Sequence, residues 1–480
     1  MTYLSVILVY LFALIAIGIV KSRKIHTQSD FALAGRALTP WVLVGTMLAS
    51  WIGTGSILGN AGKTYETGMA ALMLPIGSIL GIILLTRIAG KVRSYEKYTV
   101  PEIIGDRYGA VARNLSVFAL VMAYMVIVSY QYNAGGAVLY TILADNTGTS
   151  IISIELATII AAVFIIAYTM LAGLLSVAYT DAANSIIMTL TLIISLPILW
   201  IKAGSWSGME TAFAAMNKSQ HMQFGGVYTT MDIINFCLPP FLLVIGDANM
   251  YQRFSASKDV QSARYSTIIL VFAVLFIELL IIASAWVSSS MIPEAEVGKH
   301  VLIYAAHQFL PTFLGAIMLT TIVGIIISTA DSFLLVPANS LIRDIYLNYI
   351  NPQASEKNIV RLSRLLVLML GIIAYIVSIG FSRSAGFFER ALYAYTIYGA
   401  AITPALVAAL FWKGATKEGA VASIICGILV TLFWKELPGL WFWLPTEWYI
   451  SLDEVLPAIS GSLLALICVS YLTQKADPGK

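Results

Sequence analysis

Stretches of about 20 mostly apolar residues recur along almost the whole chain, and they constrain its fold more than any other feature. A helix of about this length spans the hydrocarbon core of a bilayer. In lipid, only helices and closed barrels satisfy every backbone polar group. Charged residues make up 11% of the 480 residues, against roughly 25% in soluble domains. The chain is therefore predicted to be an all-α integral membrane protein.

The apolar segments predict about thirteen transmembrane helices, with no soluble domain between them. They lie near residues 3–21, 40–62, 68–90, 112–140, 151–174, 180–202, 231–250, 264–288, 309–340, 360–381, 388–412, 417–435 and 454–473. Basic residues mark the cytoplasmic side of a membrane, and Lys21, Arg93, Arg253 and Arg361 fall on one side of this arrangement. We therefore expect a multi-pass protein of the plasma (cell inner) membrane, with its N-terminus outside and its C-terminus in the cytoplasm.

Two of the predicted spans carry helix-breaking residues. The second reads LASWIGTGSILGNAG (48–62), and the seventh contains Pro239, Pro240 and Gly246. Broken helices at corresponding positions in two halves of a chain are a sequence sign of a transporter's substrate site at the membrane midplane. The alternative is that the glycines only allow neighbouring helices to pack closely.

The segment IIISTADSFLL (325–335) places hydroxyls and a carboxylate inside an apolar span. Ionisable groups at such a depth are rare and usually functional. Residues three or four apart share a helix face, so Ser328 and Ser332 lie one above the other, while Thr329 is turned about 100° away. The alternative for the hydroxyls is a hydrogen bond to a carbonyl of their own helix. The alternative for Asp331 is a pair with Arg343 or another basic residue.

Neutral oxygens beside a carboxylate suit a small hard cation, and Na+ is the natural candidate. Backbone carbonyls freed near Ala49 and Ile52, where the second span is expected to unwind, would supply further ligands. A second buried acid, Asp181, stands between the fifth and sixth spans, where the spacing favours an N-cap over an ion ligand. Glu278 lies midway along the eighth span, and the sequence identifies no partner for it.

Six motifs, in a fixed order, resemble those of the solute:sodium symporter family. They are SDFALAGRALTPW (29–41), YTVPEIIGDRYG (98–109), YTMLAGLLSVAYTDAANS (168–185), QRFSASKDVQSAR (252–264), STADSFLL with RDIYLNYINPQAS (328–355) and FWKGATKEGA (411–420). The resemblance implies sodium-coupled symport of a small organic solute by alternating access. It also implies a leucine-transporter-type fold in a single domain, 1–480, with an extra helix at 3–21, two inverted five-helix repeats at 40–202 and 231–412, and two C-terminal helices within 417–473.

The resemblance further implies where sodium binds. By position, the family's sodium site takes the carbonyls of Ala49, Ile52 and Ile325 and the hydroxyls of Ser328 and Thr329. Some members bind an additional sodium, whose positions correspond to Asp181, Ser328, Asp331 and Ser332. Members with that site typically carry a hydroxyl where this chain has Asp331, so the chain departs from the pattern there.

The implied substrate site draws on the second, fourth, seventh and eleventh spans, with Ser50, Trp51, Gly53, Ser56, Tyr130, Gln131, Asn133, Asp247, Asn249, Thr396 and Tyr398. The indole of Trp51 and the carboxylate of Asp247 both favour a positive group, and no Lys or Arg falls in the middle of these spans. We therefore expect an ammonium-bearing solute, an amino acid or a related amine. The alternative is that Trp51 packs against a neighbour and Asp247 caps the break. Sugar, sialic acid or monocarboxylate symport is the alternative substrate class.

Other classes of function find little support in the sequence. There is no Walker loop, HExxH motif or nucleophile elbow, so we expect no enzyme. The net charge of +3 is small, and no nucleic-acid partner is expected. An ion channel would need a continuous polar pore, whereas the polar groups here cluster in one place. A membrane nutrient sensor without transport is the alternative from another class. The expected partners are a small organic solute, Na+ and the lipid bilayer.

Overall fold

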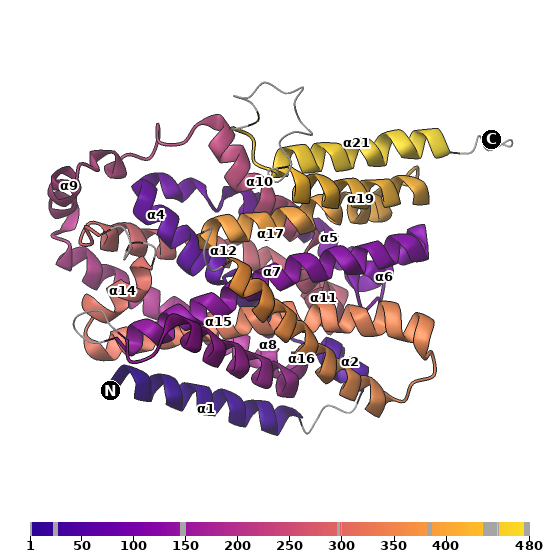
Figure 1. Cartoon of the computed structure of the whole chain (residues 1–480), viewed down its shortest axis with the longest axis horizontal. Coiled ribbons are helices and arrows are strands. Elements are labelled where there is room, and N and C mark those ends of the chain that lie inside the picture. Colours follow the sequence, from indigo (N-terminus) through magenta and orange to yellow (C-terminus); the bar gives the residue numbers. More distant parts are fainter. Residues whose placement is uncertain are drawn as a thin grey trace.

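The computed structural model of the chain describes residues 2–22, 27–144, 150–294, 298, 300–381, 386–434, 449 and 451–474. Within these residues the secondary structure is helical, apart from two isolated β-bridges. Most of the long helices run in roughly the same direction, from α1 at one edge of the bundle to α21 at the opposite edge (Figure 1). The helix α1 begins at the end of the bundle where α9 and α14 lie, and α21 ends at the other (Figure 1).

The first half of the chain forms the following helices: α1 (Thr2–Ser22), α2 (Gln28–Leu33), η1 (Ala34–Arg36), α3 (Pro40–Trp51), η2 (Gly55–Asn60), α4 (Ala61–Thr67), η3 (Gly68–Met73), α5 (Ile76–Ser94), α6 (Val100–Tyr108), α7 (Ala110–Ile142), α8 (Ile154–Lys202), α9 (Ser205–Ala215) and η4 (Ser219–Met222). The second half forms α10 (Thr230–Gly246), α11 (Ala248–Ala256), α12 (Val260–Ser289), α14 (Val301–Gln308), α15 (Thr312–Ser340), η5 (Leu341–Ile350), α16 (Glu356–Phe381), α17 (Phe387–Ala401), α18 (Thr403–Phe411), α19 (Lys417–Phe433) and α21 (Val455–Thr473).

Each predicted span overlaps a helix of the structure. By length and apolar character, eight helices in the described residues qualify as membrane spans, or nine if the bent pair 40–51 and 55–73 counts as one. The multi-pass helical architecture is therefore confirmed, and the number thirteen stays a prediction. The boundaries of the third predicted span were placed too early, because residues 68–73 form the short helix η3 and α5 begins only at Ile76.

The helical segment α8 contains two of the predicted spans. It has 49 residues, and a straight helix of that length would measure about 70 Å, more than twice the roughly 30 Å of the hydrocarbon core. It does not run straight, because Gly173 has φ 60° and ψ 169°, which is not helical. Glycine is the residue that adopts such a backbone without steric cost. The chain therefore turns at Gly173.

Both predicted breaks are present. The helix α3 ends at Trp51, and the segment that starts at Gly55 is bent by 52° from it. The helix α10 ends at Gly246, and Asp247, with φ −58° and ψ 112°, separates it from α11. Broken backbone inside a membrane protein must be enclosed by protein or line a cavity, and residues 52–59 and 242–257, which include both breaks, are buried.

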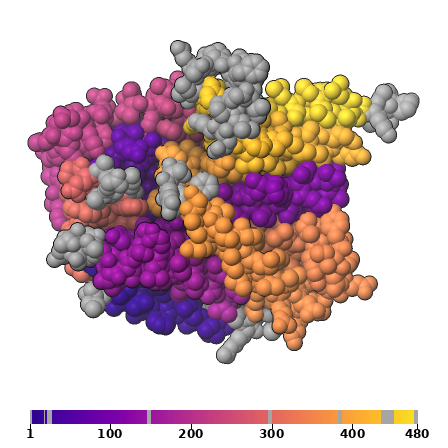
Figure 2. All heavy atoms as spheres, in the orientation of Figure 1, coloured from indigo at the N-terminus to yellow at the C-terminus, as the bar shows by residue number. Residues whose placement is uncertain are grey.

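The outer surface is apolar where lipid would contact it. The helix α16 exposes Leu365, Met369, Ile372, Ile376 and Ile379, which follow one another at intervals of three or four residues and so form a single stripe. In the space-filling view, α16 lies on the near face of the molecule, in orange (Figure 2). A soluble helix would bury such a stripe in a core, so this face is suited to hydrocarbon.

Candidate ion and solute sites

The break in α3 releases two backbone carbonyls. In a regular helix the amides of Gly53 and Ser56 would donate to the carbonyls of Ala49 and Ile52. Instead, the Gly53 N–H donates to the Trp51 carbonyl at 3.0 Å, and the Ser56 N–H donates to the Gly53 carbonyl at 3.1 Å. The carbonyls of Ala49 and Ile52, both predicted sodium ligands, are thereby free of their usual helical partners.

The helix α15 lies against this unwound turn. The Thr329 Oγ1 donates to the Ala49 carbonyl at 3.3 Å. The approach is close, because a Cβ atom added to Gly53 would lie 2.9 Å from the Thr329 Oγ1. Ile325 and Ser328, on the same helix, are 1% and 3% exposed. The structure thus brings the unwound turn and the hydroxyl-bearing helix into direct contact.

Asp181 is not an N-cap, and the interpretation that favoured capping is wrong. The turn of α8 is made at Gly173, so Asp181 lies inside the helix that follows. Its side chain is 0% exposed. The Ser328 hydroxyl donates to one of its carboxylate oxygens, and the Thr46 hydroxyl donates to the other at 2.6 Å. Asp181 therefore lies against α15, and its role as an ion ligand stays a prediction.

A buried arginine completes this region, and the sequence reasoning missed it. The sequence predicts Arg253 only as one of the basic residues that mark the cytoplasmic side, but it belongs to α11 and its side chain is 0% exposed. Its guanidinium Nη2 donates to the Ser332 Oγ at 2.5 Å and lies 3.8 Å from an Asp181 carboxylate oxygen. One sequence signal could have identified it. Arg253 stands four residues, or one helical turn, after Asn249, so a helix that continues beyond the second break would include it.

Asp331 faces elsewhere. It is 1% exposed and accepts a hydrogen bond from Thr169, in the first half of α8. The Nε atom of Arg343, the basic residue considered for it, instead lies 3.9 Å from a carboxylate oxygen of Glu102. Of the four residues predicted for an additional sodium, Asp181 and Ser332 therefore contact Arg253, Ser328 donates to Asp181, and Asp331 is hydrogen-bonded to Thr169 in the first half of α8.

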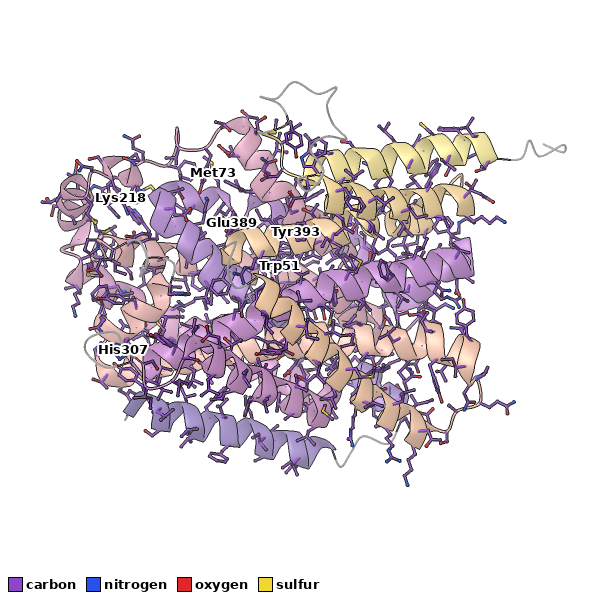
Figure 3. The ribbon with its side chains drawn as sticks, viewed as in Figure 1. Trp51, Met73, Lys218, His307, Glu389 and Tyr393 are labelled. Atoms are coloured by element: carbon purple, nitrogen blue, oxygen red, sulfur yellow. The ribbon has the colours of Figure 1, made fainter. Side chains whose placement is uncertain are left out.

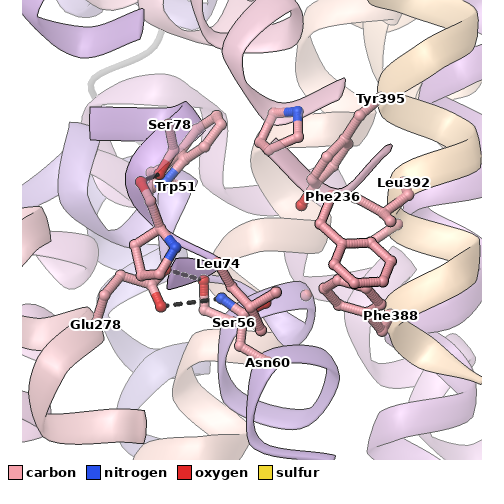
Figure 4. A pocket seen from close by; sticks show the side chains of 14 residues that line it. Trp51, Ser56, Asn60, Leu74, Ser78, Phe236, Glu278, Phe388, Leu392 and Tyr395 are labelled. Atoms are coloured by element: carbon pink, nitrogen blue, oxygen red, sulfur yellow. Dashed lines mark hydrogen bonds between the residues drawn. The ribbon is translucent and has the colours of Figure 1, made fainter. Parts of the chain in front are cut away.

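A small cavity of about 30 Å³ lies beside the first break, between η2, α5, α10, α12 and α17 (Figure 4). Its walls are mostly aromatic or apolar, with Trp51, Leu74, Pro75, Phe236, Pro240, Phe388, Ala391, Leu392 and Tyr395, and its polar lining residues are Ser56, Ser78, Asn60 and Glu278. The rings of Trp51 and Tyr395 stack with centroids 6.3 Å apart. The position of Trp51 near the centre of the bundle is visible in Figure 3.

Glu278 supplies the carboxylate of this cavity. It is 2% exposed and lies midway along α12. The Ser56 Oγ donates to one carboxylate oxygen at 2.5 Å and the Asn60 amide donates to the other at 3.0 Å (Figure 4). Both donors belong to the helical turn that follows the break. The partners that the sequence did not identify for Glu278 are therefore side chains of the broken span itself.

Most other residues predicted for the substrate hold the breaks in place. Asp247 accepts hydrogen bonds from the Tyr124 hydroxyl at 2.5 Å and from the Asn249 amide at 3.0 Å, and it caps α11. The Tyr398 hydroxyl donates to the Gly246 carbonyl at 2.8 Å. Of the predicted set, Trp51 and Ser56 line the cavity.

The remaining predicted residues do not line this cavity. Gln131 accepts a hydrogen bond from Thr54, the Ser50 hydroxyl donates to the carbonyl one turn earlier, and so does the Thr396 hydroxyl. Tyr130 is 1% exposed. Asn133 lines a second, wider cavity of about 690 Å³, which shares Phe388 with the first.

A helical bundle with two broken helices at its centre, one of them in contact with a hydroxyl-bearing helix, defines a transporter of the leucine-transporter type. Its structure is similar to a Na+-coupled sialic acid symporter in a substrate-bound outward-open state (TM-score 0.81, 15% identity, 99% of this chain and 98% of that one). It is also similar to Mhp1, a nucleobase-cation-symport-1 family transporter (TM-score 0.59, 11% identity, 93% and 95%). These likenesses confirm the predicted fold.

Residues 31–427 match the sodium:solute symporter family, and the chain belongs to that family. Among curated relatives, the sodium/proline symporter of Haemophilus influenzae is 27% identical over 98% of this chain and 94% of its own length. The high-affinity proline transporter PutP of Bacillus subtilis is 26% identical over 96% of each chain. Sodium-coupled symport of a small organic solute across a membrane, with Na+ as the coupling ion, is thereby confirmed.

Proposed function

We propose that the chain imports an ammonium-bearing solute, an amino acid or a related amine, together with Na+. The observation that carries the proposal is the cavity beside the first break, where a carboxylate faces an aromatic pair. Of the residues that line it, all within the described part of the chain, only Glu278 carries a formal charge. A negative group beside the faces of Trp51 and Tyr395 favours a cation through charge and through cation–π attraction.

The same cavity offers a place for the carboxylate of an amino acid. Gly55 and Ser56 line the cavity at the start of the helical segment η2 and α4. The beginning of a helix carries the positive end of its dipole. A zwitterion would therefore place its ammonium group toward Glu278 and its carboxylate toward this helix start.

The apolar walls favour a solute with an apolar body. Phe236, Pro240, Phe388 and Leu392 surround the charged corner. The relatives described above are proline transporters, and proline combines an amine, a carboxylate and an apolar ring. Proline and similar amino acids are therefore the first candidates.

Sodium binding would connect the two helices that meet at the first break. The proposed ligands are the carbonyls of Ala49, Ile52 and Ile325 and the hydroxyls of Ser328 and Thr329. An ion held by both α3 and α15 stabilises the state in which the solute cavity is formed. By thermodynamic linkage, the ion and the solute then raise each other's affinity by the same factor.

The membrane arrangement is proposed on the same basis. Residues 1–480 form one domain, with inverted repeats at 40–202 and 231–412, the N-terminus outside and the C-terminus in the cytoplasm. The start of α1 and the end of α21 at opposite ends of the bundle support this orientation (Figure 1). We also propose that the chain carries out transport without catalysis, as its family does.

Thermal stability of the purified protein tests the proposal. We expect the unfolding midpoint to rise in NaCl relative to KCl and to rise further with proline or another amino acid, because ligands that bind the folded state stabilise it. Glu278→Gln should keep the sodium effect and lose the additional rise. The matched variant Asp247→Asn, which alters the capping carboxylate, should keep both effects.

Three outcomes would contradict the proposal. A rise with a sugar, sialic acid or a monocarboxylate in place of amino acids would favour the alternative substrate class. Loss of the solute effect in Asp247→Asn and not in Glu278→Gln would show that the ammonium group of the solute pairs with Asp247, as the sequence predicts, and not with Glu278. Binding without any uptake in vesicles would favour a sensor.

A further inference from the structure

The guanidinium of Arg253 lies at the centre of a fully buried polar cluster on α3, α8, α11 and α15. Its Nη2 donates to the Ser332 Oγ at 2.5 Å and lies 3.8 Å from Asp181. Its Nε donates to the Thr46 Oγ1 at 3.4 Å. Its Nη1 donates to the carbonyl of Asn249 at 3.4 Å. Arg253 and Asp181 are both 0% exposed.

These contacts use the oxygen atoms that a second sodium ion would need. The Ser332 hydroxyl accepts from Arg253, and both Asp181 carboxylate oxygens accept hydroxyl hydrogens, from Ser328 and Thr46. A hard cation needs several oxygen lone pairs at once. A sodium ion among Asp181, Ser328 and Ser332 would compete for these lone pairs with a positive charge that is covalently part of the chain, and the two cations would repel each other.

The cluster has a different effect on the sodium site between α3 and α15. Because the Ser328 hydroxyl donates its hydrogen to Asp181, the lone pairs of its oxygen are directed away from the carboxylate. A hydroxyl oriented in this way is prepared to coordinate a cation. The ion pair of Asp181 and Arg253 would thus position one ligand of the first ion while the guanidinium excludes a second.

We infer that Arg253 is the resident cation of this cluster in place of an additional sodium, so that the chain couples one Na+ to each solute. The inference rests on the proposed sodium site formed by Ala49, Ile52, Ile325, Ser328 and Thr329. Asp331 makes no hydrogen bond within the cluster, because it accepts from Thr169 in the first half of α8, although its carboxylate lies near enough to Asp181 for the two to interact electrostatically. For a zwitterionic solute, each cycle then moves one net charge.

Equilibrium binding of radioactive ²²Na+ to the purified protein tests this count. The wild type should saturate at one ion per chain, and Thr329→Ala should weaken that binding at least tenfold. Arg253→Gln leaves Asp181 without its cation, and we expect it to saturate at two ions per chain. The double variant Arg253→Gln with Asp181→Asn removes both charges of the pair and should return to one.

The outcomes separate the inference from the function on which it rests. Two ions bound to the wild type would overturn the inference and leave the proposed sodium site intact. No bound ion would contradict that site and, with it, the count of one. A single ion in well-folded Arg253→Gln would show that the guanidinium is not what excludes the second. If that variant does not fold, the number of sodium ions bound to the wild type still tests the inference. The ratio of charge to labelled proline moved in wild-type proteoliposomes, expected to be one, is a second measure of the same number.

Discussion

At the scale of single residues, the chemistry of the site depends on side chains that are far apart in the sequence. Ser56 and Glu278 share a hydrogen bond of 2.5 Å across 222 positions. The sequence marked Asp181, Ser328 and Ser332 as polar groups in apolar surroundings, and it identified them because buried polar groups are costly. It did not identify Arg253, because a basic residue near a predicted span end is indistinguishable from a loop residue until the helices are packed.

Gly53 tests the contact between the unwound turn and α15. In Gly53→Ala the new methyl group would meet the Thr329 Oγ1 and Cγ2 atoms at 2.9 Å, so the Thr329 side chain, a proposed sodium ligand, or α15 itself must shift. We expect the apparent sodium affinity to fall at least tenfold, measured as the sodium concentration that gives half of the thermal stabilisation. Gly225→Ala is the control, since nothing lies within 4 Å of its added atom. Equal sodium affinity in both variants would contradict the proposed site.

At the scale of elements, glycine and proline made the two breaks predictable, but not the turn inside α8. The sequence placed the boundary of the sixth span at the Thr-Asp pair of residues 180–181, because that pair is a good helix cap. The structure turns at Gly173, and Thr180 donates back to carbonyls of its own helix, at 3.1 Å to Ser176 and 3.0 Å to Val177. A lone glycine in an apolar helix signals packing as often as a turn, so local sequence could not separate the two positions.

The variant Gly173→Ala tests this turn. Its backbone, with φ 60° and ψ 169°, lies in a region that is essentially restricted to glycine, and strain there costs on the order of 1–3 kcal/mol. We expect the unfolding midpoint in detergent to fall, with sodium binding retained in the protein that folds. Gly380→Ala, in α16, has open space around its added atom and should be neutral. A neutral Gly173→Ala would argue against the observed turn.

The short helices α9 and η4 are joined to the bundle through His221. The Trp286 indole N–H donates to the His221 carbonyl at 2.9 Å, and the imidazole packs on Phe213 with ring centroids 5.2 Å apart. Burial, together with the nearby Lys218 ammonium, lowers the pKa of His221 from 6.5 to about 4. The folded protein therefore keeps this imidazole neutral at pH values where the unfolded chain protonates it.

This shift predicts how stability depends on pH. Between pH 6.5 and about 4 the unfolded chain binds more protons, so the free energy of unfolding should decrease as the pH falls through this window, by up to about 3 kcal/mol, and level off below it. Comparison of unfolding midpoints at pH 7.5 and 4.5 measures the effect. His221→Gln, which does not titrate, should lose part of this pH dependence. An unchanged slope in that variant would contradict the assignment to His221.

At the scale of the whole molecule, sequence alone predicted an all-helical membrane protein of the correct family with two broken helices. The lengths of the apolar segments and the order of the six motifs can be read from the sequence without a structure. The solute cavity was predicted less well, because Trp51 and Ser56 were identified whereas Asn60, Phe236, Glu278 and Tyr395 were not. Which side chains meet across α12, α17 and the first break depends on helix rotation, and a sequence pattern does not determine it.

Uptake of labelled proline into proteoliposomes tests the central claim most directly. With an inward sodium gradient and an inside-negative potential, one sodium ion moving through 100 mV supplies about 2.3 kcal/mol, enough for more than tenfold accumulation. We predict such accumulation in the wild type, its loss when K+ replaces Na+, and its loss in Glu278→Gln. Uptake that is equal in Na+ and K+, with proline or any amino acid of the panel, would contradict sodium-coupled import of an ammonium-bearing solute.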